Sequence, residues 1–394
     1  MSTRRRSVLK AAGSLTILAA AGGVWRCVDA GVFGAGSGPA FAPWDDWRAG
    51  MNDGPLALVR AAILAASPQN SQPWRFRVSP TRIELHADPL RSLGASDPFL
   101  REMHLALGCA LENMLLAARA QGFAAEVELA AGRIDGSVPP APVVVLSLRR
   151  AEPVYTPLAT AIPLRHTNRG PYDMGRSLSP ETLSAIDALV PDIDGVRLVL
   201  FTDTEQRAAF GAEVLGAAEA ILGDAVMLAA QDVWFRGEWS AVQAERDGLI
   251  PDAAGIPGLE TAILKFLPRA ESGVRGDRWL RQLREVQVPA TPAFGLIAVR
   301  DLYDRAQALR AGRAWQRLHL WAASRGLALQ PVNAPLERVD RERQLGVEPV
   351  TSRRLAGFTG DPAWQPTFAF RAGYPLQPAA ASPRRPVEWV LLGA

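Results

Sequence analysis

Two short stretches decide how this chain folds: SPQNSQPW at residues 67–74 and RHTNR at residues 165–169. The first follows an apolar helical run at residues 57–66 and precedes RFRV at residues 75–78, which alternates as a strand does. Because proline and small polar residues stop a helix, we expect a tight helix–turn–strand connection here. Its amide side chains suit the polar edge of a flat ring; the alternative is an ordinary turn with Trp74 in the core.

The second stretch places Arg165, Thr167 and Arg169 at alternate positions. If the segment is extended, all three side chains point to one side. Two guanidinium groups and a hydroxyl then form a cradle for phosphate, because arginine gives forked, charge-assisted hydrogen bonds to phosphate oxygens. A helix is predicted soon afterwards, with Ser179 as its N-cap and Pro180 in its first position. The alternative is an arginine-rich surface loop.

Together these stretches resemble the FMN-dependent nitroreductase family. Residues 165–169 match the segment that holds the FMN phosphate in that family, with Thr167 in place of serine, and residues 67–74 match its Ser-x-x-Asn-x-Gln-Pro-Trp segment. GLALQPVN at residues 326–333 resembles the segment whose backbone approaches the flavin N5 edge. SPRRP at residues 382–386 resembles the closing basic pair, although its two arginines could instead be solvated.

The resemblance extends over about residues 55–394 and implies one FMN, bound within a single chain. It implies the following cofactor-binding residues: Ser67, Pro68, Asn70, Gln72, Arg165, His166, Thr167, Arg169, Pro331, Val332, Asn333, Arg384 and Arg385.

An internal repeat accounts for the order of the two motifs, which is inverted relative to the family. GCALENMLLAARAQG at residues 108–122 resembles GRAWQRLHLWAASRG at residues 312–326, and both read as long helices ended by glycine. The apolar runs at residues 143–148 and 295–299 are predicted to be matching buried strands. We therefore expect an α+β, nitroreductase-like fold in which two diverged halves with mixed, largely antiparallel sheets form a pseudo-dimer. This arrangement resembles the monomeric, Acg-like branch of the family and predicts a monomer.

The expected organisation has three parts. Residues 1–40 are an export signal and linker, residues 41–154 are the N-terminal half, and residues 155–394 are the C-terminal half. The C-terminal half contains an insertion at about residues 233–292, where aromatic and charged residues alternate with glycine and proline hinges. This insertion is either a lid over the cofactor or a helical decoration at the interface of the halves.

The N-terminus carries RRRSVLK at residues 4–10, which resembles a twin-arginine export signal. Residues 11–24 are apolar, but the run is too short and not hydrophobic enough for an ordinary membrane span. It is typical of the apolar region of a signal peptide. The pattern predicts export to the periplasm by the twin-arginine machinery, with the leader either cleaved or retained as a membrane attachment. The alternative is a basic N-terminal helix of a cytosolic protein.

Composition favours a folded enzyme and excludes several other classes. The chain has 394 residues, 48% of them hydrophobic, so it can bury a large core. The net charge of +3 depends on a basic leader, so it is no indication of nucleic-acid binding. With two cysteines and four histidines, the sequence predicts neither a disulfide framework nor a zinc site. It contains no GxGxxG motif, so we do not expect a separate nicotinamide domain.

These observations predict an FMN-binding oxidoreductase of the nitroreductase type. NAD(P)H or another electron donor would reduce the flavin at N5, and a nitro- or quinone-like acceptor would reoxidise it in ping-pong order. No side-chain acid or base is assigned. One alternative is an FMN-sequestering flavoprotein with little turnover, and another is an envelope interaction protein that binds no flavin.

Overall fold

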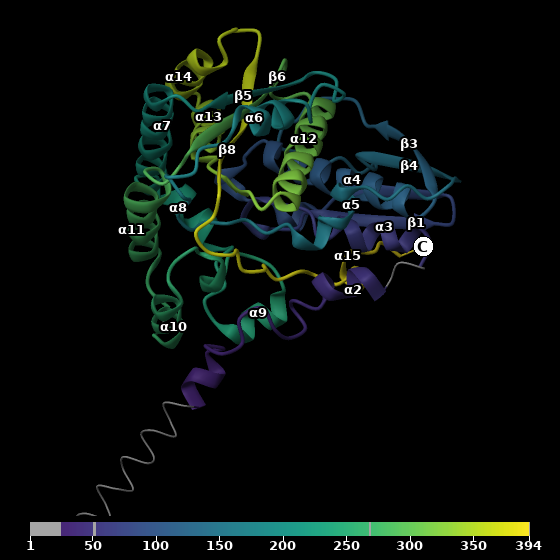
Figure 1. Cartoon of the computed structure of the whole chain (residues 1–394), viewed down its shortest axis with the longest axis horizontal. Helices are drawn as coiled ribbons and strands as arrows, with labels where there is room; N and C mark the ends of the chain where they lie inside the picture. Colours follow the sequence, from purple (N-terminus) through teal and green to yellow (C-terminus); the bar gives the residue numbers. More distant parts are fainter. Residues whose placement is uncertain (1–24, 50–52, 268, 394) are drawn as a thin grey trace, which may run out of the picture.

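The computed structural model describes residues 25–49, 53–267 and 269–393 (Figure 1). Of the expected export signal and linker at residues 1–40, residues 1–24 lie outside this part of the chain and residues 25–40 lie within it. Within it, no helix combines the length and the apolarity needed to cross a membrane.

The first half is built on an antiparallel sheet of four strands in the order β1-β2-β4-β3. The strands are β1 (Trp74–Ser79), β2 (Arg82–Ala87), β3 (Phe123–Leu129) and β4 (Val144–Arg150). Helix α3 (Pro55–Ala62) precedes β1, as the apolar run predicts, and the 20-residue helix α4 (Arg101–Ala120) joins β2 to β3.

The second half repeats this arrangement. Its four antiparallel strands lie in the order β5-β6-β8-β7, and the 20-residue helix α12 (Arg305–Ser324) joins β6 to β7. The strands are β5 (Val196–Phe201), β6 (Ala293–Val299), β7 (Ala328–Pro331) and β8 (Gln365–Gly373). The α+β class is therefore confirmed, with antiparallel sheets rather than mixed ones.

One expected correspondence is wrong. The apolar run at residues 143–148 enters β4, which follows its long helix, whereas residues 295–299 lie in β6, which precedes its helix. By strand order β6 corresponds to β2, and β4 corresponds to β8. Both runs form buried central strands, and because both are buried, their sequences are similarly apolar.

Helices α4 and α12 pack against each other in the middle of the molecule (Figure 1). They cross at Gly108 and Gly312, where a Cβ on Gly108 would overlap the carbonyl of Leu309 and a Cβ on Gly312 would overlap the carbonyl of Leu105. The contact is reciprocal, as in a two-fold symmetric interface. Each helix is followed by a glycine with positive φ, Gly122 at 70° and Gly326 at 69°, as the sequence predicts.

The remaining helices are divided between the two halves, and the long β5–β6 connection carries several of them. Between β5 and β6 the chain runs through residues 202–292, where the corresponding β1–β2 connection has only two residues. The extra chain relative to the first half thus begins before the insertion expected at residues 233–292. The helices of the β5–β6 connection are α7 (Thr204–Leu222), α8 (Ala225–Asp232), α9 (Trp239–Glu245), α10 (Gly258–Phe266) and α11 (Ser272–Gln282). The others are α2 (Pro43–Ala49), α5 (Pro157–Thr160), α6 (Pro180–Asp187), α13 (Ala334–Leu345), α14 (Val350–Thr359) and α15 (Val387–Val390).

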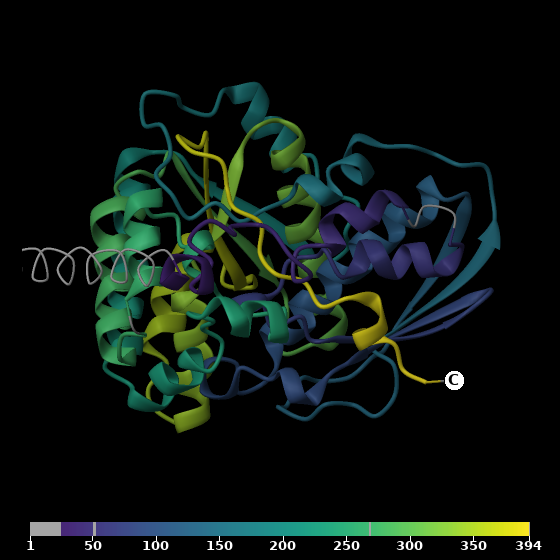
Figure 2. The same cartoon turned by 90° about the horizontal axis from the view of Figure 1, so that it is seen from below.

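After β8 the chain returns to the first half, and Figure 2 shows this yellow segment crossing the molecule. The backbone N–H of Arg384 donates to the carbonyl of Ala40 at 2.7 Å, and that of Leu392 donates to Phe76 on β1 at 2.7 Å. The C-terminal segment therefore carries its basic pair to the turn before β1.

Candidate functional site

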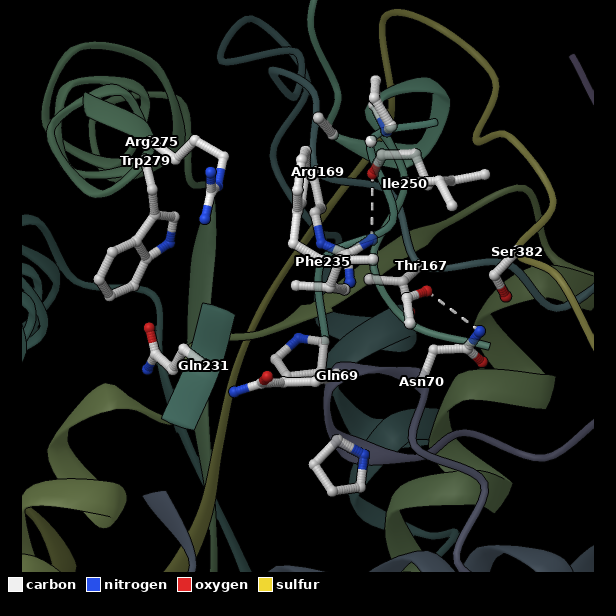
Figure 3. Close-up of a pocket in the computed structure, with 18 of the residues that line it drawn as sticks. Gln69, Asn70, Thr167, Arg169, Gln231, Phe235, Ile250, Arg275, Trp279 and Ser382 are labelled. Atoms are coloured by element: carbon white, nitrogen blue, oxygen red, sulfur yellow. Dashed lines mark hydrogen bonds between the residues drawn. The ribbon is translucent and has the colours of Figure 1, made fainter. Parts of the chain in front are cut away.

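A cavity of about 650 Å³ opens where these segments meet (Figure 3). Its size lies in the range of cofactor and small-molecule sites. The wall comes from both halves: the turn at residues 67–70, helix α4, residues 165–169, the β7–α13 junction and residues 382–384. Ten of the predicted site residues line it: Ser67, Pro68, Asn70, Arg165, Thr167, Arg169, Pro331, Val332, Asn333 and Arg384.

The turn before β1 has an unusual backbone. Gln69, Asn70 and Gln72 have φ angles of 48°, 56° and 54°, in the left-handed region that non-glycine residues seldom adopt. Ser67 helps to hold this conformation, because its Oγ accepts a hydrogen bond from the Gln72 N–H at 3.1 Å. Strained backbone of this kind is often found at functional sites, where the surrounding structure maintains it.

The turn fixes the basic pair of the C-terminal segment. Asn70 Oδ1 accepts a hydrogen bond from Arg384 Nη1 at 2.8 Å, and Asn70 Nδ2 donates to the Pro383 carbonyl at 2.9 Å and to the Gly248 carbonyl at 3.2 Å. The Asn70 amide is thus occupied by protein partners. Its role is to orient Arg384 at the cavity.

Arg165, Arg169 and Arg384 give the cavity a positively charged end. Arg165 donates to the Leu64 carbonyl at 3.2 Å and Arg169 to the Ala253 carbonyl at 3.0 Å, while the Nε atoms of Arg165 and Arg384 have no hydrogen-bond partner within the described chain. No carboxylate of the described residues lies within 4.0 Å of these three guanidinium groups.

Burial, followed by mutual repulsion, changes the acid–base properties of these arginines. Burial and the neighbouring Arg169 lower the pKa of Arg165 to about 10, and burial lowers the pKa of Arg169 to about 10 as well. The pKa of Arg384 falls well below its usual range, again from burial and then from Arg165. Uncompensated buried charge is costly, so this end of the cavity is suited to an anion.

Trp44, at the other side of these arginines, is a site residue that the sequence analysis missed. The Arg384 guanidinium lies 4.8 Å from the centre of its ring and that of Arg165 lies 5.9 Å away, distances typical of cation–π contacts. Its indole N–H donates to the Ser382 carbonyl at 2.7 Å. The only signal was a pair of tryptophans, Trp44 and Trp47, in the segment after the linker, and this pair does not indicate a partner.

The junction of β7 and α13 forms another wall. The Val332 N–H donates to the Ala369 carbonyl at 2.9 Å, and the Asn333 side chain accepts from the Ala369 N–H at 2.7 Å. Because that side chain is used in this way, it does not cap α13. The Leu336 and Glu337 N–H groups donate to the Asn333 carbonyl at 2.8 and 3.0 Å, and Pro335 has no N–H. Of the first turn, the Ala334 N–H alone lacks an acceptor within the described chain, and Ala334 lines the cavity.

The long connection between β5 and β6 closes the cavity from the remaining side, and Figure 3 shows Phe235, Ile250, Arg275 and Trp279 around it. It is docked on the strained turn, since the Gly248 N–H donates to the Asn70 carbonyl at 3.2 Å. The expected insertion thus lies over the predicted site.

Three predicted residues do not line the cavity. Gln72 is fully buried and its amide is used by protein partners, accepting from the Arg385 N–H at 2.8 Å and donating to the Arg246 carbonyl at 2.9 Å. Arg385 itself has a carboxylate nearby, that of Asp88 at 3.8 Å. The His166 ring packs on Trp44 with ring centres 4.5 Å apart. These side chains face protein neighbours and not the cavity, although His166 Nδ1 and Arg385 Nε have no hydrogen-bond partner within the described chain.

Comparison with known proteins gives a sequence relative. The Mycobacterium tuberculosis protein named "Putative NAD(P)H nitroreductase", found in strains CDC 1551 / Oshkosh and ATCC 25618 / H37Rv, is 29% identical over 288 residues, which cover 71% of this chain and 76% of the relative. The chain is similar to nitroreductases. No family model matches it.

Solved structures give weaker similarity. The FMN-dependent nitroreductase NfnB from Mycobacterium smegmatis in complex with NADPH is 14% identical, with a TM-score of 0.38, over 60% of this chain and 99% of that one. A nitroreductase with bound FMN from Desulfitobacterium hafniense DCB-2 is 12% identical, with a TM-score of 0.36, over 61% of this chain and 100% of that one. Similarity at this level does not establish a shared function.

Proposed function

We propose that this chain is an FMN-dependent oxidoreductase of the nitroreductase type that takes electrons from NAD(P)H and passes them to a nitro- or quinone-like acceptor in ping-pong order. One observation carries the proposal: three guanidinium groups without a carboxylate partner lie at one end of a cavity lined by both halves of the chain. The sequence similarity to the mycobacterial nitroreductase supports the same reaction class.

The residues present fit FMN. Arg165, Thr167, Arg169 and Arg384 would hold the phosphate, since two of these guanidinium groups have an unpartnered Nε. The apolar part of the wall would accommodate the ring, and it includes Leu105, Ala106, Cys109, Trp315 and Phe368.

Bound FMN would supply hydride transfer at its N5 atom. The chain would contribute binding and exclusion of water. The Ala334 N–H provides a hydrogen-bond donor at the positive end of α13, on the β7–α13 wall. Phe235, Ile250 and Trp279 line one side of the cavity, where they would limit the access of water to a bound ring.

A second candidate function is FMN sequestration with little turnover. It is favoured by the way in which the β5–β6 connection, residues 202–292, is attached over the cavity; we call this connection the cover. Lys265 of α10 is buried, and its Nζ donates to the Gly31 carbonyl at 2.5 Å and pairs with Asp252 at 2.9 Å. The Trp239 ring of α9 packs directly on Gly31. A cover held in this way would slow the entry of nicotinamide and acceptor.

Anaerobic addition of NADPH to the FMN-loaded chain tests both functions. Rapid bleaching of the flavin absorbance, followed by multiple turnovers with a quinone or nitro compound, would support the reductase. Flavin that stays oxidised would support sequestration or a different donor. A chain that takes up no FMN on incubation would refute both.

We further propose that the two halves form a pseudo-dimer within one monomeric chain. The identical strand orders and the reciprocal Gly108–Gly312 crossing support this interpretation. Analytical ultracentrifugation should give the mass of a single chain across a wide concentration range, whereas a stable dimer at the lowest concentration would contradict it.

Export by the twin-arginine pathway is also proposed, on the basis of residues 4–10. Replacing Arg5 and Arg6 together by lysine should leave the protein in the cytoplasm of a host with this pathway. Continued export of the double variant would exclude the assignment.

A further inference from the structure

Two acidic side chains line the same cavity as the unpartnered arginines. Glu102 projects from α4 and Glu337 from α13, and both contribute to the wall. Glu102 is 3% exposed. The proposed function above gives neither side chain a role.

These two carboxyl groups belong to a buried cluster with too little positive charge. The carboxyl groups are those of Asp97, Glu102, Glu337 and Asp340. Among the described residues, one guanidinium group lies within 4.0 Å of any of these carboxylates, that of Arg101. Four ionised carboxylates beside one cation would be strongly unfavourable in a poorly solvated environment. The cluster must therefore retain protons at neutral pH.

Hydrogen bonding indicates which members retain them. Asp340 pairs with Arg101 at 2.8 Å and accepts from the Tyr303 hydroxyl at 2.8 Å, while Asp97 accepts from the backbone N–H groups of Glu102 and Met103 at 3.1 and 2.9 Å. These contacts stabilise negative charge. Burial and the neighbouring Asp340 nevertheless raise the pKa of Asp97 to about 6, which leaves it mainly ionised at pH 7.

The other two carboxyl groups have weaker support. Glu102 accepts from the Asn333 amide at 2.9 Å, with Arg101 3.8 Å away, and Glu337 accepts from the Gln231 amide at 3.1 Å. Burial and the nearby acids raise the pKa of Glu337 to about 7, and burial and Glu337 raise that of Glu102 well above its usual range.

We propose that Glu102 and Glu337 share a proton at the cavity wall and deliver it to the electron acceptor as it is reduced. The inference rests on the proposed reductase function for its chemistry, whereas the shared proton itself does not depend on cofactor binding. Because the two groups interact, they titrate as a pair.

The step balances for a quinone. The quinone takes up one hydride, which originates from NAD(P)H as it is oxidised to NAD(P)⁺, and one proton, which leaves the carboxyl pair; the product is the hydroquinone. The pair then carries one more negative charge and regains a proton from water. Glu102 is buried whereas Glu337 keeps some exposed surface, so we assign the return of the proton to Glu337.

The test separates proton transfer from electron transfer. The FMN-loaded protein is reduced with NADPH and then mixed either with a quinone or with ferricyanide, a one-electron acceptor that takes up no proton. Glu102→Gln and Glu337→Gln should slow reoxidation by the quinone about 100-fold, in the range of general-acid effects, while ferricyanide rates stay within about twofold. Glu84→Gln on β2, outside the cavity wall, serves as the control and should change neither rate.

Equal slowing with both acceptors would overturn the proposal, because it would indicate a structural role. So would unchanged quinone rates in both variants. Infrared spectroscopy of the FMN-free chain at pH 7 gives a readout that does not need activity: a carboxylic acid C=O band should be present and should be lost in Glu102→Gln or Glu337→Gln. Absence of the band in the unmodified chain would refute the shared proton. If the band is present but the chain takes up no FMN, the shared proton is supported and the reductase function alone is refuted.

Discussion

Replacing Arg165 by methionine should have opposite effects on the stability of the FMN-free chain and on its affinity for FMN. Arg165 is 2% exposed, and burial lowers its pKa from 12.5 to about 10. A pKa shift of this size corresponds to about 3 kcal/mol. Arginine is charged at pH 7 in both the folded and the unfolded chain, so the whole cost of burying the charge is present at pH 7. This cost disappears only as the pH rises from the pKa of Arg165 in the folded chain, about 10, toward its ordinary value of 12.5 in the unfolded chain.

Methionine keeps an unbranched apolar stem and removes the charge. It also removes the donor to the Leu64 carbonyl, and a buried acceptor without a partner costs about 1–3 kcal/mol. The FMN-free Arg165→Met chain should therefore range from unchanged to about 2 kcal/mol more stable in urea unfolding. FMN should bind about 10- to 100-fold more weakly, because charge-assisted hydrogen bonds contribute about 1.5–3 kcal/mol, and riboflavin should bind as before.

Arg371→Met is the matched control. Arg371 is equally buried, but it donates to four oxygen acceptors at 2.6–3.3 Å. Its removal leaves these acceptors without their donor and should destabilise the chain by at least 3 kcal/mol. If Arg165→Met destabilises the FMN-free chain as much as Arg371→Met does, or weakens FMN and riboflavin binding equally, the phosphate assignment is wrong.

Three further predictions concern the helix crossing, the response to acid and the cover. Gly312→Ala should destabilise the chain by about 1–3 kcal/mol in urea unfolding through overlap at the crossing, whereas Gly216→Ala, with open space around its Cβ, should stabilise it by about 0.5–1 kcal/mol; the same sign for both would contradict the close contact. Burial lowers the pKa of His166 from 6.5 to about 3, so the chain should lose stability as the pH falls below 6.5, and His166→Phe should reduce this loss in thermal melts. Lys265→Met should raise the FMN dissociation rate severalfold by freeing the cover, and an unchanged rate would show that α10 does not control exit.

Local signals were sufficient to predict the parts of this structure that local interactions determine. The turn at residues 67–74, the N-cap Ser179 and the glycine-ended helices were predicted because proline, small polar residues and glycine act on the backbone within a few positions. The alternation of Arg165, Thr167 and Arg169 likewise predicted that all three face one cavity.

Features that depend on distant contacts could not be predicted in this way. A short apolar run indicates that a strand is buried, but not which position it takes in a sheet. The apolar runs of β4 and β6 were therefore expected to correspond, although they do not. The sequence shows that Gln72 has an amide, but not that Arg385 and Arg246 occupy it. Trp44 and Glu337 reach the site only through the tertiary fold, and no local pattern marks either residue.

The long separation between Asn70 and Arg384 along the chain has a consequence for biosynthesis. Its guanidinium is held by Asn70, 314 residues earlier, and Leu392 pairs with Phe76 on β1. A ribosome makes the chain from the N-terminus at about 5–20 residues per second, so the strained turn emerges long before the arginine that it holds. The anion end of the cavity is therefore completed only after both halves have been synthesised, and nascent chains that stop before Arg384 would lack part of it.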